Sequence, residues 1–173
     1  HLTHLTLAGA TLDTSDLRAI STFLPHIRHL DVSQSIFETG GVTFVDALVG
    51  SSGIGLPCLR YLNVRDAVLG SGYRQDNLLG DLRRLKCTQL EFLGVDGMLN
   101  ATDVSRALRD TCPETLQTLA IRSARTIDFN ALLALRGLKE LVVCDCLKMV
   151  PRKSLGGDGL KLSVMICGAC GFM

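Results

Sequence analysis

A short pattern of hydrophobic positions recurs along the whole chain. Its clearest copy is LKELVVCDC, with a first anchor at Leu138, a second at Leu141, a third at Val143 and a closing residue at Cys146. Other copies begin at residues 2, 27, 59, 90 and 116, and a weaker one begins at Gly159, where the first anchor is lost. The third anchors fall at residues 7, 32, 64, 95, 121, 143 and 164. Recurrence at a period of about 20–30 residues indicates an array of structural repeats.

Each copy predicts one short β-strand. The second and third anchors lie two residues apart, so their side chains point to the same face of an extended segment. One strand of this length cannot bury its hydrophobic face alone. Stacking the copies as a parallel ladder, about 4.8 Å apart, covers each anchor with the same anchor of the next copy. We therefore expect Leu93 to lie between Leu62 and Leu119.

The pattern resembles the leucine-rich repeat family, and the resemblance covers essentially residues 1–173. It implies an α/β fold, a leucine-rich repeat solenoid of about seven repeats. Its curved parallel sheet would lie on the concave side, with helices and turns on the convex side. The closing residues are small or sulfur-containing and never Asn. In this respect the chain resembles the ribonuclease-inhibitor-like and cysteine-containing (F-box-type) subclasses more than the Asn-rich extracellular ones. The chain starts at His1 inside a copy, so we expect a single domain that is a piece of a longer protein.

The segments between the copies predict helices. Thr14 and Ser15 are expected to cap a helix that carries Leu17, Ile20 and Leu24 on one face and stops at Pro25. A second helix is expected to open at Gly40 and Gly41, with Val42, Val45 and Val49 on one face. A third is expected after Asp76, with Leu78, Leu82 and Leu85.

Composition argues against several partner classes and favours a reducing compartment. The net charge is +1 and Trp is absent, so nothing favours nucleic acid or an anionic membrane as a partner. Charged residues interrupt every hydrophobic run, which argues against a membrane span. The seven cysteines are odd in number and scattered, which favours free thiols and a cytoplasmic protein. A glycosylation sequon, Asn100-Ala101-Thr102, favours secretion, which we expect less.

Two clusters could carry metal or thiol chemistry. Cys144-x-Cys146 and Cys167-x-x-Cys170 together resemble a four-thiolate zinc site. However, Cys146 and Cys167 both close a copy, so they are expected to stack inside the repeat array as small apolar residues. His4 and His29 occupy the same place in successive copies, but no third ligand accompanies them. Because no nucleophile lies in a recognisable catalytic motif, we predict neither an enzyme nor a cofactor.

The residues that flank the anchors are expected to form the exposed face of the sheet. In the first four copies the residue just before the second anchor carries a ring. In the third, fourth and fifth copies the residue just after the third anchor is Arg65, Asp96 and Arg122, so the sign of the charge alternates. Such charges could bind a partner or pair with one another across the ladder. The candidate partner-binding residues are His4, His29, Asp31, Tyr61, Asn63, Arg65, Phe92, Asp96, Arg122 and Glu140.

These features favour a non-catalytic module that binds a protein through its concave sheet face. Three alternatives stay open from the sequence. One is the substrate-recognition part of a ubiquitin ligase, as in F-box leucine-rich proteins, and another is a structural subunit of a cytoskeletal or ciliary assembly. The third is a thiol or zinc activity between Cys144 and Cys170.

Overall fold

The structure of the chain is a computed structural model. It describes residues 1–38, 40–50, 53, 55–69, 78, 82–85, 87–96, 114–122, 132, 135–144 and 161–165. The asparagine sequon, the expected cap at Asp76 and three cysteines of the zinc hypothesis, Cys146, Cys167 and Cys170, lie outside these residues.

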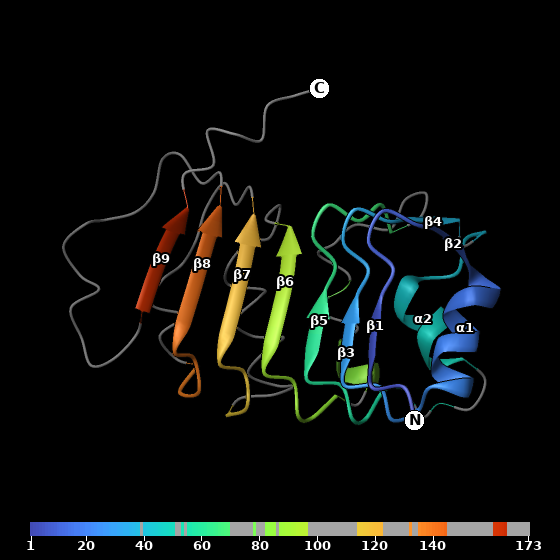
Figure 1. The fold of residues 1–173 in the computed structure, drawn as a ribbon, viewed down its shortest axis with the longest axis horizontal. Helices are drawn as coiled ribbons and strands as arrows, with labels where there is room; N and C mark the ends of the chain where they lie inside the picture. The colour runs from blue at the N-terminus through green and yellow to red at the C-terminus, as the bar shows by residue number, and fades with distance from the viewer. Residues whose placement is uncertain are drawn as a thin grey trace, which may run out of the picture.

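The fold is α/β and is built on one parallel sheet. Seven strands form this sheet in the order β1-β3-β5-β6-β7-β8-β9, so each strand lies beside the next copy of the hydrophobic pattern (Figure 1). All of its pairs are parallel. The strands are β1 His4–Thr6, β3 His29–Asp31, β5 Tyr61–Asn63, β6 Phe92–Asp96, β7 Thr118–Arg122, β8 Glu140–Cys144 and β9 Lys161–Met165. The prediction of one strand per copy is confirmed.

The register of the sheet follows the anchors. Leu62 pairs with Leu93, and Leu93 pairs with Leu119, as the sequence predicted. These leucines are fully buried and belong to one hydrophobic core. A slip by one residue would turn every anchor to the opposite face, so burial of the leucines fixes the register. We call the opposite face of this sheet, which points away from the core, the outer face.

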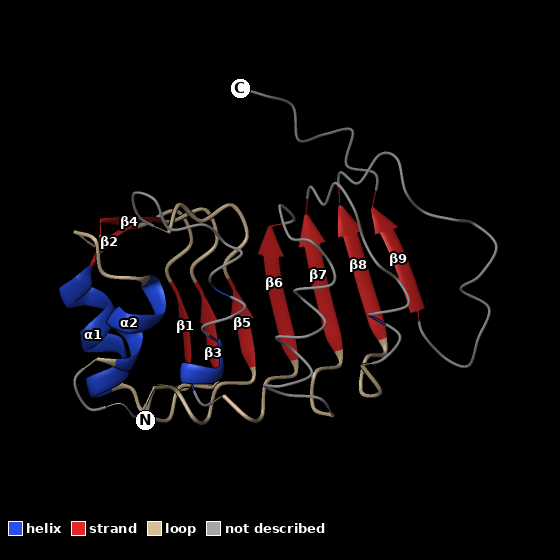
Figure 2. Ribbon diagram, turned by 180° about the vertical axis from the view of Figure 1, so that it is seen from behind, coloured by secondary structure: helices blue, strands red, loops and turns tan. Residues whose placement is uncertain are grey.

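Helices of the first repeats close the core beneath the N-terminal strands. Helix α1, Thr14–Phe23, and helix α2, Phe44–Val49, lie side by side next to these strands (Figure 2). Leu17 and Ile20 are buried, as predicted, and α1 stops before Pro25 with Leu24 as its C-cap. The predicted caps, Thr14 and Ser15, were wrong. Asp13 caps α1 because its carboxylate accepts hydrogen bonds from the backbone N–H groups of Ser15 and Asp16.

Helix α2 is shorter than the sequence suggested. Helix α2 begins after its cap Thr43, because Gly40 and Gly41 have left-handed φ angles of 59° and 93° and cannot start a helix. Of the helix expected after Asp76, Leu78 is helical and a short 3-10 helix, η1 Leu82–Leu85, follows, while residues 70–77 and 79–81 lie outside the described residues. Leu85 is buried in the core, as is Leu78. No helix in the described part of the chain is long and apolar enough to cross a membrane.

A second, smaller parallel sheet was not predicted. Strand β2, Thr11–Asp13, pairs with β4, Ile36–Glu38, and a single bridge from Ile36 to Val68 continues the row into the third repeat. The same tight turn precedes each of these segments, with the backbone N–H of the closing residue donating to the third anchor's carbonyl. At the second turn the buried Ser35 hydroxyl also donates to the Leu7 carbonyl at 2.7 Å. The Ser35 side chain thus ties the second turn to the backbone of the first.

The glycine-rich loop before β5 offers a test of this packing. Gly53 and Gly55 both have left-handed φ angles, of 63° and 64°. A Cβ atom on Gly55 would lie 2.5 Å from the Leu85 carbonyl oxygen, whereas one on Gly53 would meet nothing within 4 Å. We expect Gly55→Ala to lower the free energy of unfolding by about 2–3 kcal/mol, through backbone strain and overpacking. The control Gly53→Ala should cost about 1 kcal/mol. Urea unfolding measures both, and equal losses would contradict this packing of the loop on η1.

Candidate protein-binding face

Four rings form a continuous stack on the outer face. His4 and His29 lie with ring centroids 5.3 Å apart, His29 and Tyr61 3.8 Å apart, and Tyr61 and Phe92 4.1 Å apart. The last two pairs are within 8° of parallel. We call these four residues the ring ladder. The sequence placed them in one row, and the structure brings all four together.

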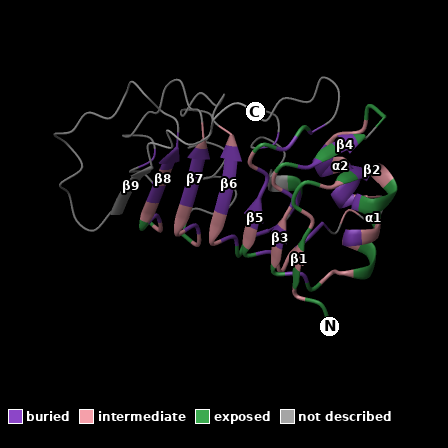
Figure 3. Cartoon of the chain, turned by 45° about the horizontal axis from the view of Figure 1, so that its top comes forward, coloured by how far each residue is buried: buried purple, intermediate pink, exposed green. Residues whose placement is uncertain are grey.

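The sheet register explains the stack. Neighbouring parallel strands lie about 4.8 Å apart, close to the separation that stacked rings prefer. His4, His29, Tyr61 and Phe92 occupy the same register position in four consecutive strands. His29 and Tyr61 each have a ring stacked on both faces, so mainly their ring edges are accessible to a partner. Figure 3 shows the amino ends of β6 and β7, where Phe92 and Thr118 lie, as partly exposed strand ends beside buried strand centres.

The ladder affects the protonation of its members. Burial lowers the pKa of His29, and the neighbouring His4 lowers it further, against an opposing effect of the Asp31 carboxylate. Burial raises the pKa of Tyr61, and Asp31 adds to that rise. Burial therefore favours the neutral forms of both groups.

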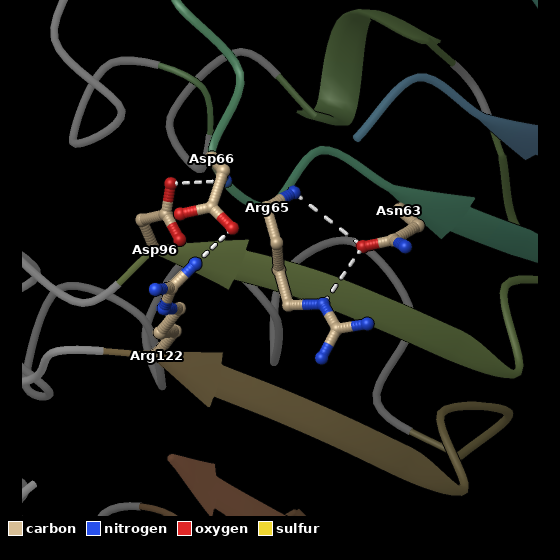
Figure 4. Close-up of polar contacts among 5 residues, drawn as sticks. All are labelled: Asn63, Arg65, Asp66, Asp96 and Arg122. Atoms are coloured by element: carbon tan, nitrogen blue, oxygen red, sulfur yellow. Dashed lines mark hydrogen bonds and ion pairs between the residues drawn. The ribbon is translucent and has the colours of Figure 1, made fainter. Parts of the chain in front are cut away.

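A polar network lies directly above the ladder along the strands. Asn63 is only 2% exposed, and its Nδ2 donates to Asp31 Oδ2 at 3.2 Å. Its Oδ1 accepts from Arg65 Nε at 3.0 Å and from the Arg65 backbone N–H at 3.4 Å (Figure 4). Burial favours a higher pKa for Asp31, but the hydrogen bonds from Ser33 and Asn63 outweigh it, so the pKa is lowered. Asp31 is thus held as a carboxylate that fixes Asn63.

Gly94 makes room for this network. It pairs with Asn63 in the neighbouring strand, and a Cβ atom on it would lie 2.5 Å from Asn63 Oδ1. The missing side chain lets the Asn63 amide lie close to β6, where it is buried. Sequence reasoning treated Asn63 as an exposed contact residue, and this part of the prediction was wrong. The signal that could have corrected it is the lone glycine inside a strand pattern.

The charged row after the third anchor is arranged differently from the sequence expectation. Arg122 forms an ion pair with Asp66, a turn residue that the sequence analysis did not select (Figure 4). The backbone N–H of Asp66 donates to Asp96 Oδ2 at 2.5 Å. Asp66 thus links the carboxyl ends of β6 and β7. Its φ angle of 58° belongs to the turn that follows β5, and Gly9 and Gln34 adopt the same left-handed conformation after β1 and β3.

The remaining candidates lie toward the C-terminal strands. Glu140 is half-buried and starts β8, in register with Thr118. Cys144 is buried at the end of β8, although the alternation of the strand places it on the outer face. Among the described residues, no group of three or more His, Cys, Asp or Glu side chains could hold a metal ion. His4 and His29 stack on each other as members of the ring ladder.

We compared the chain with models of protein families, with curated proteins and with solved structures, and none of them matches it.

Proposed function

We propose that this chain is a leucine-rich repeat solenoid that binds a protein partner through the outer face of its sheet and carries no catalytic activity. The solenoid assignment is supported by the sequential order of the seven parallel strands and by their shared anchor register. The same left-handed turn after β1, β3 and β5 supports it further. The odd number and scattered positions of the seven cysteines support a reducing, cytoplasmic setting.

The ring ladder is the observation that carries the binding proposal. Tyr61 and Phe92 are half-buried, so each keeps apolar edge area exposed beside fixed polar groups. Aromatic side chains held by their neighbours bind a partner with little loss of conformational freedom, which is why they recur as interface anchors. The polar groups nearby are engaged with one another through Asp31, Asn63 and Arg65, an arrangement that supports a rigid surface more than a reactive centre.

Site-specific photo-crosslinking tests which face meets the partner. Benzoylphenylalanine at Thr118 would extend the ring ladder by one strand, because Thr118 is in register with Phe92. The same probe at Arg18, an exposed residue of α1, is the matched control. We expect irradiation in cells to join one partner of discrete mass to the Thr118 variant and none to the Arg18 variant. Capture at Arg18 without capture at Thr118 would place the interface on the helical side and contradict the proposal.

A further inference from the structure

The Arg65 side chain is fixed through its Nε, whereas its terminal guanidinium nitrogens are available to a ligand. Its Nε and its backbone N–H both donate to Asn63 Oδ1. In the part of the chain that the structure describes, no acceptor meets its two terminal nitrogens, Nη1 and Nη2. Figure 4 shows the side chain lying across β6, with its Nε but neither terminal nitrogen joined to Asn63 by a dashed line. The residue is half-buried, so the guanidinium lies on the outer face rather than extending into bulk solvent.

The support under Arg65 is rigid. Asn63 is 2% exposed and is itself tied to Asp31 across the strands. Gly94 leaves the space in which the Asn63 amide lies, and any larger residue there would push that amide away. A guanidinium fixed through Nε loses little further freedom when its terminal edge binds a ligand. That edge presents two parallel N–H groups, the geometry that matches the two oxygens of a carboxylate.

The surrounding charges select the ligand. The Arg122 guanidinium is engaged with Asp66. Two carboxylates lie near Arg65 through its neighbours in the chain, because Asp31 is bonded to Asn63 and Asp96 to the backbone of Asp66. A phosphate dianion would add two charges beside these carboxylates, whereas a carboxylate adds one. The site therefore fits a singly charged anion with two coplanar oxygens.

We propose that Arg65 binds the side-chain carboxylate of an Asp or Glu in an extended segment of the partner. This inference rests on the proposed function and names the partner chemistry of the same face. Tyr61 and Arg65 lie four residues apart, which is about 13 Å along an extended strand. A partner segment running with the sheet would place an apolar or aromatic side chain on the edges of Tyr61 and Phe92, about four residues from its acidic residue. Aromatic faces suit those positively polarised ring edges.

Peptide libraries test this assignment. The probes are acetylated, amidated nonapeptides with one fixed Tyr and, four residues away, a fixed Glu, Gln or phosphoserine, the other positions being randomised. We expect wild-type protein to capture the Glu library roughly tenfold better than the Gln library, the size of a charge-assisted hydrogen-bonded pair. Arg65→Gln should abolish this preference yet still capture Tyr-containing peptides, which reports that it is folded. Arg65→Lys should retain a weaker preference, because it keeps the charge without the two-pronged geometry.

The outcomes separate this inference from the proposed function. Equal capture of Glu and Gln peptides by wild type, or an unchanged preference in Arg65→Gln, overturns the role of Arg65. Better capture of phosphoserine than of Glu overturns the choice of a carboxylate. If Glu and Gln peptides are captured equally, but capture still falls in Tyr61→Ala/Phe92→Ala, only the Arg65 assignment is lost. If wild type captures none of the libraries better than Tyr61→Ala/Phe92→Ala does, the Arg65 assignment is contradicted. Crosslinking at Thr118 then decides the proposed function separately.

Discussion

Leu93→Ala should lower the free energy of unfolding by about 2–5 kcal/mol. Leu93 is the second anchor of the fourth copy and is 0% exposed. It pairs with Leu62 on one side and with Leu119 on the other, at the centre of the seven-stranded sheet. Truncation removes three buried carbon atoms and leaves a cavity that both neighbouring strands would have to close. Since the two flanking leucines are locked in register, we expect little collapse and a loss toward the upper end of that range.

Urea unfolding followed by circular dichroism measures this loss. Phe23→Ala is the matched control, because it removes a larger apolar side chain from a residue that is 78% exposed at the end of α1. A change at such a surface position is expected to stay within about 0.5 kcal/mol. A near-zero shift of the unfolding midpoint for Leu93→Ala would show that the anchor register is wrong.

The sheet could be predicted because two independent constraints agree. Anchors two residues apart fix which face of a strand is buried, and the repeat spacing fixes which strand follows which. The second sheet could not be predicted in this way. Strands β2 and β4 are three residues long and bury one residue each, Leu12 and Phe37, so they are too short to show a repeated alternation. The start of α1 was missed because Asp13, Thr14 and Ser15 are all good caps, and only the geometry of Asp16 selects among them.

Part of the candidate site could likewise be predicted from the sequence, and part could not. The ring ladder followed from the sequence because a parallel register carries each position onto the same position of the next strand. The ion pair between Arg122 and Asp66 did not, since it depends on a left-handed turn after β5 that brings a loop carboxylate back over β7. The burial of Asn63 likewise depends on the absence of a side chain at Gly94 in the neighbouring strand β6. The sequence of β5 alone therefore does not indicate that Asn63 is buried.

Tyr61→Ala combined with Phe92→Ala should weaken binding of the crosslinked partner by about 2 kcal/mol or more, roughly 30-fold in Kd. The two rings form the C-terminal half of the ring ladder, and both point away from the leucine core. Their removal takes away two stacking contacts, His29 with Tyr61 and Tyr61 with Phe92, each worth about 0.5–1.5 kcal/mol. The fold should therefore lose about 1–3 kcal/mol while the core stays intact. Titration calorimetry with purified partner measures the affinity, below the temperature at which the variant unfolds.

Phe23→Ala again serves as the control, because Phe23 is an exposed ring on α1 rather than on the outer face. We expect it to leave the affinity unchanged. The opposite result, with normal affinity in the double variant and a loss in Phe23→Ala, would mean that the partner binds the helical side. An unchanged affinity in both would exclude either ring surface as the contact centre. Because the double variant keeps Arg65 and its support by Asn63, its remaining affinity also measures what the polar part of the face contributes without the rings.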